Sequence, residues 1–92
     1  MSVEKRQEIM EKVPFGARVR AFMSDDVEEL WGLVKEHEVE YPKFSLYVGM
    51  KILEMRGPDV LLKFLERNDL KDEGLARRLS EEARDKKEKG GS

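Results

Sequence analysis

The stretch from Lys43 to Arg56 is apolar on two opposite sides of a predicted helix. Its apolar residues recur every three or four positions, which is the spacing of an α-helix. They form two sets, Phe44, Tyr47, Val48, Ile52 and Met55 on one side and Leu46, Met50 and Leu53 on the other. Two strands around Gly49 are the alternative, because residues 44–48 also have β-propensity. The spacing favours a helix, and a helix that is apolar all round belongs in the middle of a bundle.

An amphipathic helix is expected before this segment, over Asp25–Val39. The run Ser24-Asp25-Asp26 favours a helix start, because short oxygen-bearing side chains accept the unpaired N–H groups of a first turn. The inward stripe of this helix is Val27, Leu30, Trp31, Val34 and His37 or Glu38.

Three shorter segments complete the predicted helices. Gly57 and Pro58 end one helix and begin the next, which we expect over Pro58–Arg67. A last helix is expected from Glu73 to about Lys87, and a first short helix over Val3–Lys12. Residues 17–23 alternate as in a strand but also fit helical spacing, and we prefer a helix.

These elements predict an all-α fold, a compact bundle of four or five short helices around a central helix at residues 43–56. We expect one helical domain over residues 1–84 and a charged, glycine-rich flexible tail over residues 85–92. Gly32 and Gly49 lie inside predicted helices, and we expect close approach of two helix backbones at both. This arrangement predicts that Trp31→Ala or Tyr47→Ala unfolds the domain, whereas truncation after Ala83 leaves it folded.

Composition sharpens this picture of a small folded domain. The chain has 92 residues, of which 41% are charged, against roughly 25% in an average protein. It has one Asn, one Gln, no Thr and no Cys, a bias towards ionic side chains that is typical of proteins from hot habitats. We expect a thermophilic source. Neither a signal-peptide core nor a membrane-spanning run is present, so we expect a cytoplasmic protein without a membrane partner.

The inventory of reactive residues predicts that the protein is not an enzyme and binds no cofactor. Without cysteine there is no thiolate nucleophile and no cysteine-ligated zinc. The single histidine, His37, lies near Glu36, Glu38 and Glu40, but a metal site needs more converging ligands, and a half-buried structural histidine is the commoner case. No Gly-x-Ser-x-Gly motif or phosphate-binding glycine loop occurs.

Partner binding is the function that the remaining residues favour. The N-terminal third holds more large apolar residues than one small core is expected to bury, and exposed methionine and phenylalanine often mark an interface. The alternative is that they close the open end of the bundle. We expect a non-catalytic adaptor or self-associating protein, a monomer or homodimer, that contacts itself or another protein. The candidate interface residues are Met10, Phe15, Phe22 and Met23.

Nucleic-acid binding by a regulatory protein is the second hypothesis. Residues 60–79 resemble the first two helices of a helix-turn-helix domain, although no third, recognition helix follows them. Basic side chains of the last helix could contact phosphates, but interleaved acids at i,i+4 spacing could pair with them instead. The candidate phosphate contacts are Arg77, Arg78, Arg84, Lys86 and Lys87.

Overall fold

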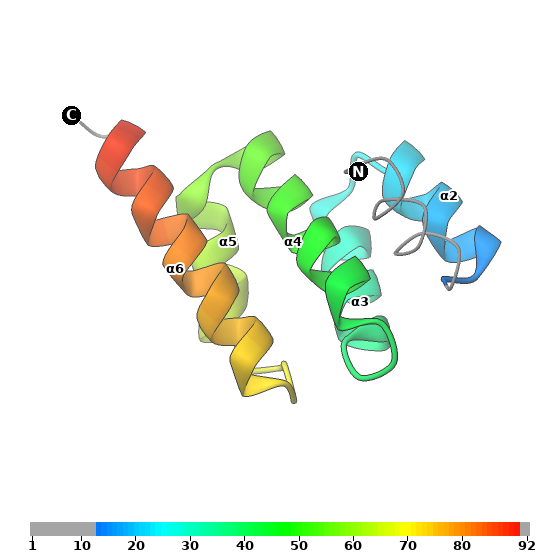
Figure 1. Cartoon of the computed structure of the whole chain (residues 1–92). Helices are drawn as coiled ribbons and strands as arrows, with labels where there is room; N and C mark the ends of the chain where they lie inside the picture. Colours follow the sequence, from blue (N-terminus) through cyan, green and yellow to red (C-terminus); the bar gives the residue numbers. More distant parts are fainter. Residues whose placement is uncertain (1–12, 91–92) are drawn as a thin grey trace, which may run out of the picture.

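The computed structural model describes residues 13–90, and this part of the chain folds into five α-helices without a strand (Figure 1). The predicted all-α bundle is confirmed, and residues 17–23 are helical. The predicted helix over Val3–Lys12 lies outside the described residues. The helices are α2 (Phe15–Met23), α3 (Val27–His37), α4 (Pro42–Arg56), α5 (Pro58–Glu66) and α6 (Glu73–Gly90).

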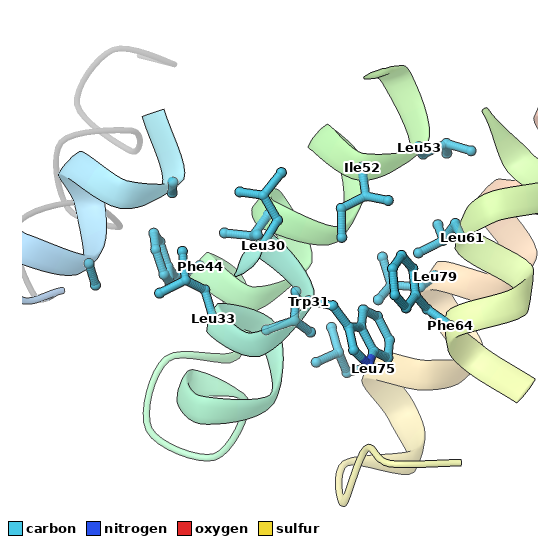
Figure 2. Close-up of a cluster of buried hydrophobic side chains, with 14 of the residues drawn as sticks. Leu30, Trp31, Leu33, Phe44, Ile52, Leu53, Leu61, Phe64, Leu75 and Leu79 are labelled. Carbon is cyan, nitrogen blue, oxygen red and sulfur yellow. The ribbon is translucent and has the colours of Figure 1, made fainter. Parts of the chain in front are cut away.

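α4 is the central helix, as its sequence predicts. It packs against α3, α5 and α6, and these four helices enclose the main part of the core (Figure 2). Trp31 of α3 stacks on Phe64 of α5 with 5.2 Å between ring centroids. The fully buried large side chains include Trp31, Phe44, Leu30, Ile52, Leu53, Leu61 and Leu79.

Tyr47 is misplaced by the sequence prediction. It is 43% exposed on α4 and not buried in the core, so we no longer expect Tyr47→Ala to unfold the domain. α4 buries the i,i+4 rows that contain Phe44, Val48 and Ile52 and, beside them, Ser45, Gly49 and Leu53. The apolar pattern covers more of α4 than α3, α5 and α6 do, because three neighbouring helices in a small domain leave one side of the central helix in water.

The two glycines inside helices have different surroundings. A methyl group built on Gly49 would lie 2.6 Å from Cδ2 of Leu79, so the side chain of Leu79 from α6 packs directly against Gly49. The neighbour is a side chain and not the backbone that we expected from the sequence. A methyl group built on Gly32 would meet no atom within 4 Å, so the same prediction is wrong for Gly32. Gly57, between α4 and α5, has a φ of 91°, a conformation that favours glycine over residues with a side chain.

A buried carboxylate fixes the start of α6. Glu38, in the turn after α3, is only 2% exposed, and its Oε1 accepts hydrogen bonds from the backbone N–H groups of Lys71 and Asp72, each at 2.7 Å. These groups precede α6, whose first N–H groups have no partner inside the helix and whose N-terminus carries partial positive charge. Glu38 therefore ties the α3–α4 turn to the α5–α6 turn.

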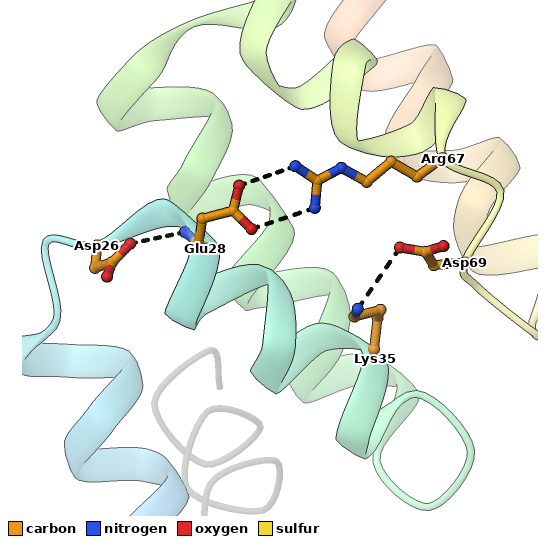
Figure 3. Close-up of polar contacts among 5 residues, drawn as sticks. All are labelled: Asp26, Glu28, Lys35, Arg67 and Asp69. Carbon is orange, nitrogen blue, oxygen red and sulfur yellow. Dashed lines mark hydrogen bonds and ion pairs between the residues drawn. The ribbon is translucent and has the colours of Figure 1, made fainter.

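A second, exposed link joins α3 to the end of α5 (Figure 3). Arg67 donates two hydrogen bonds to the carboxylate of Glu28, at 3.2 and 2.9 Å, and Lys35 lies 3.6 Å from Asp69. The hydrogen bonds from Arg67 hold the pKa of Glu28 below its ordinary value and raise the pKa of Arg67. Asp26 begins α3 as expected, since its Oδ1 accepts the N–H of Glu28 at 3.0 Å.

α6 is longer than its apolar stripe predicts. Its last buried residue is Ala83, but the helix continues to Gly90, so the predicted domain end at residue 84 falls inside α6. Glu, Arg and Lys are good helix formers, and Lys89 pairs with Asp85 one turn away at 3.2 Å. The flexibility of the tail and the effect of truncation after Ala83 stay predictions. No helix within the described residues is long and apolar enough to cross a bilayer.

Candidate functional site

α2 is attached to the bundle by its smallest residues. Pro14 precedes the helix, and the first intrahelical bond joins the N–H of Arg18 to the carbonyl of Pro14 at 3.1 Å. Ala17 and Ala21, one turn apart, are the buried residues of the helix, and α2 packs on α3. Short side chains on the inner face let the helix axis lie close to the bundle.

A lysine from the central helix fixes the end of α2. Lys51 Nζ donates hydrogen bonds to the backbone carbonyls of Ala21 and Phe22, the latter at 3.0 Å. The last carbonyls of a helix have no partner inside it and form the negative end of its dipole, so a cation there is favourable. α2 is therefore held from two sides, by alanine packing along its length and by Lys51 at its C-terminus.

The outer face of α2 carries large apolar side chains in water. Phe15, Phe22 and Met23 are 71%, 70% and 75% exposed, and Val19 between them is 41% exposed. Their spacing of four, three and one residues places them on one side of the helix. Together with Arg18 they surround a shallow hollow of about 390 Å³. We call these five residues the α2 face.

Two arginines accompany the apolar residues of the α2 face. Arg18 lines the hollow, with its guanidinium carbon 5.5 Å from the centre of the Phe15 ring. The Nε of Arg18 is buried and has no hydrogen-bond partner in the described part of the chain. Arg20 is exposed, and helical geometry places it beyond the other edge of the apolar stripe. Neither arginine forms an ion pair with a described residue.

The structure brings three of the four predicted interface residues together. Phe15, Phe22 and Met23 share the α2 face, whereas Met10 lies outside the described residues. The prediction did not include Arg18 and Val19. Val19 lies one turn from both Phe15 and Met23, a signal that was available once helix was preferred to strand for residues 17–23.

The predicted phosphate contacts are divided between two sides of α6. Arg84 and Lys87 line a hollow of about 660 Å³ between α5 and α6, together with Lys63 and the acids Asp59 and Glu66. Lys86 lines a different hollow, next to α4, which also contains three acids, Glu54, Glu82 and Asp85.

Acids pair with several of these cations. Arg78 Nε lies 3.1 Å from Glu82, and Lys87 Nζ lies 3.0 Å from Asp59, whereas Arg77 is exposed and makes no ion pair with a described residue. The i,i+4 pairing of Arg78 with Glu82 is one that the sequence spacing suggests, while the contact between Lys87 and Asp59 crosses from α6 to α5. A continuous basic surface does not form over the described part of α6.

The segment that resembles a helix-turn-helix has a different geometry. α5 and α6 lie side by side and run in opposite directions (Figure 1), with Asp59 at the start of α5 paired to Lys87 near the end of α6. In a helix-turn-helix the two helices cross at roughly 90–120°. Residues 60–79 therefore belong to an antiparallel hairpin that buries Leu61, Phe64, Leu75 and Leu79.

The sequence neighbours of the single histidine do not converge on it. His37 Nδ1 lies 3.1 Å from the carbonyl oxygen of Leu33, and its ring packs edge-on against Phe44 with centroids 5.5 Å apart. Glu38 is directed to the start of α6, and within the described residues no three His, Cys, Asp or Glu side chains are grouped as metal ligands would be. His37 has the half-buried structural position that its spacing suggested.

Searches of protein-family models, curated proteins and solved structures found no match to this chain.

Proposed function

We propose that this protein is a non-catalytic interaction module that binds a protein partner through the α2 face. The observation that carries the proposal is the inverted placement of side chains on α2, where alanines are buried and two phenylalanines and a methionine are in water. Fully burying one such side chain is worth roughly 1.5–3 kcal/mol. The fold leaves that stabilisation unused, and a partner that covers the face would gain it.

The anchoring of α2 also supports a binding role. Ala17, Ala21 and Lys51 hold the helix in place, so the exposed rings are presented on a fixed backbone. A fixed surface loses less conformational entropy when a partner binds than a flexible segment does. Aromatic residues and arginine, which are enriched at interfaces, make up much of the face.

Phe22→Asp tests this function, with Val39→Asp as the matched control. Val39 is also apolar and 71% exposed, but it lies in the turn after α3. A protein captured from the source cells by the wild-type chain would be purified and its affinity measured by calorimetry. We expect Phe22→Asp to weaken binding at least about thirtyfold, since a central aromatic is often worth 2 kcal/mol or more. Equal binding by both variants would contradict the proposal.

Nucleic-acid binding is the second candidate, and one observation favours it. Lys63, Arg84 and Lys87 come from two helices and line one hollow, where they could contact a phosphate backbone. Binding of this kind weakens steeply with salt, so the affinity for duplex DNA should fall by orders of magnitude between roughly 50 and 200 mM salt. Arg84→Glu should abolish it. If the affinity does not depend on salt, or if Arg84→Glu leaves it unchanged, nucleic-acid binding through this hollow is excluded.

The cellular setting that we propose is the cytoplasm of a thermophile. Charged residues make up 41% of the chain, cysteine is absent, and ion pairs join elements distant in sequence, such as Glu28 with Arg67 and Asp59 with Lys87. Ion pairs lose less to desolvation at high temperature. A melting temperature above about 90 °C would support this origin, and one near 50 °C would contradict it.

A further inference from the structure

We infer that the partner of the α2 face is an amphipathic helical segment of another protein, apolar on its contacting stripe and acidic along both edges. This inference rests on the proposed function and names the class of partner. It is carried by the two arginines, Arg18 and Arg20, that border the apolar residues on opposite sides.

The hollow and its apolar residues fit the stripe of a helix. Phe15, Val19 and Phe22 follow the i, i+4, i+7 spacing of a surface that packs ridges against another helix. Their hollow of about 390 Å³ is open and almost wholly apolar, so it suits one or two inserted side chains of leucine size. Recognition of an amphipathic helix by an apolar surface uses anchors with this spacing.

The unpaired arginines specify the charge of the partner. Arg67 pairs with Glu28 and Arg78 with Glu82, whereas other exposed arginines such as Arg77 have no acid partner within the described residues. Arg18 and Arg20 differ from those in that they border the apolar stripe of the α2 face. Arg18 and Arg20 have no such acid within the described residues, and the buried Nε of Arg18 has no acceptor there. A carboxylate at the edge of a partner helix could pair with the guanidinium group of either arginine, with the directed geometry that guanidinium groups favour.

A second copy of the chain is a poor partner for this face. A two-fold axis pairs each surface with its own copy. If two α2 helices pack antiparallel, Arg18 faces Arg18 and Arg20 faces Arg20, and if they pack parallel, Arg18 faces Arg20. Both arrangements place like charges together at the edge of the contact, which is unfavourable. The face therefore selects against self-pairing and for an acidic partner.

The test uses two designed helical peptides with the same leucine stripe, one with glutamates along both edges and one with lysines. Fluorescence anisotropy of each labelled peptide measures its affinity for the full chain. We expect the glutamate peptide to bind at least about tenfold more tightly, since edge charges change from attraction to repulsion. The preference should shrink as salt screens these charges.

Charge reversal then identifies the residues responsible. The double variant Arg18→Glu and Arg20→Glu should prefer the lysine peptide, whereas Arg56→Glu, an exposed arginine at the end of α4, should leave the wild-type preference intact. Phe22→Asp should remove binding of both peptides. Circular dichroism melts confirm that each variant is folded.

Each contrary result overturns the inference in a recognisable way. Equal affinity for the two peptides would exclude an acidic edge as a requirement on the partner, but the α2 face would still be a binding surface. If neither peptide binds but a cellular protein is still captured in a Phe22-dependent way, the partner is not an amphipathic helix of this kind. The proposed function is then unaffected. If sedimentation shows that the chain forms a dimer and Phe22→Asp abolishes it, the occupant of the α2 face is a second copy of the chain. Arginine-dependent binding to phosphatidylglycerol vesicles, with no peptide bound, assigns it to a membrane surface.

Discussion

In α4 and its neighbours most of the large apolar side chains point inward, and Trp31, Phe44 and Ile52 are fully buried. In α2 the two alanines point inward, and both phenylalanines are about 70% exposed. Both regions contain phenylalanine, valine and methionine, and both have helical periodicity. The difference is the side of the helix on which the large side chains lie. In α4 and its neighbours they are buried and stabilise the fold, and in α2 they form the surface that we propose for a partner.

The largest expected effect is on the free energy of unfolding, and it is seen by replacing one aromatic residue from each region with alanine. Trp31→Ala should lower the free energy of unfolding by about 3–5 kcal/mol, because it removes a buried ring that stacks on Phe64. Phe22→Ala should change it by less than about 0.5 kcal/mol. Chemical denaturation measures both. A loss with Phe22→Ala that approaches the Trp31→Ala value would show that the chain itself buries Phe22, and the contrast between the regions would disappear.

A smaller effect is expected at the buried carboxylate. Glu38→Ala removes the acceptor of two backbone N–H groups and should cost about 2–3 kcal/mol, since charged hydrogen bonds are worth more than neutral ones. Glu38→Gln should cost less, because an acceptor oxygen is retained. Glu40→Ala, an exposed neighbour, is the control and should be close to neutral. A neutral Glu38→Ala would mean that the start of α6 is stabilised without this contact.

Replacing the two helical glycines with alanine should change the stability of the fold in opposite directions. Gly32→Ala should stabilise the fold by about 0.5–1 kcal/mol, because alanine favours a helix and a methyl group meets nothing there. Gly49→Ala gains the same helix propensity but must displace the buried Leu79, so it should destabilise by about 1–2 kcal/mol. Thermal melts measure both variants. Stabilisation by Gly49→Ala would show that α6 can shift away from α4.

The smallest effect is a pH dependence from Glu28. Its folded-state pKa is lowered by the hydrogen bonds from Arg67, so its contribution to stability is present above the unfolded pKa and is lost as pH falls below about 4.5, its ordinary value. The pair is exposed, and solvent screening keeps the contribution small. Arg67→Met should flatten this part of the stability curve and return the pKa of Glu28, followed by NMR, towards its ordinary value. An unchanged pKa would exclude Arg67 as the cause.

Local patterns predicted most of the fold. The apolar spacing of residues 43–56, the cap at Asp26 and the Gly57-Pro58 junction gave helices that agree with the structure to within two residues. These signals are read over a few neighbouring positions, so the sequence alone contains them. Phe15, Phe22 and Met23 were singled out as large apolar residues, but the expected helix began at residue 17, so their common face became visible only with the structure of α2.

Contacts between residues far apart in the sequence could not be predicted from these local patterns. The inward stripe included Glu38, but nothing near it indicates that its carboxylate accepts N–H groups 33 and 34 residues away. Tyr47 fits an apolar stripe, and only the number of helices around α4 decides that it stays exposed. The contact of Lys51 with α2 likewise joins residues about 30 positions apart. Which cations remain unpaired, and hence the role given to Arg18, depends on such contacts.

The carboxylate of Glu38 should also slow the opening of the turn before α6. Amides in a short surface turn ordinarily exchange with deuterium within the time of local fraying, because solvent reaches them without disturbing the core. The amides of Lys71 and Asp72 are bonded to an oxygen buried beneath the α3–α4 turn, so their exchange requires the two turns to separate. Their exchange should therefore be slower than that of ordinary turn amides, and it should report the separation of the two turns.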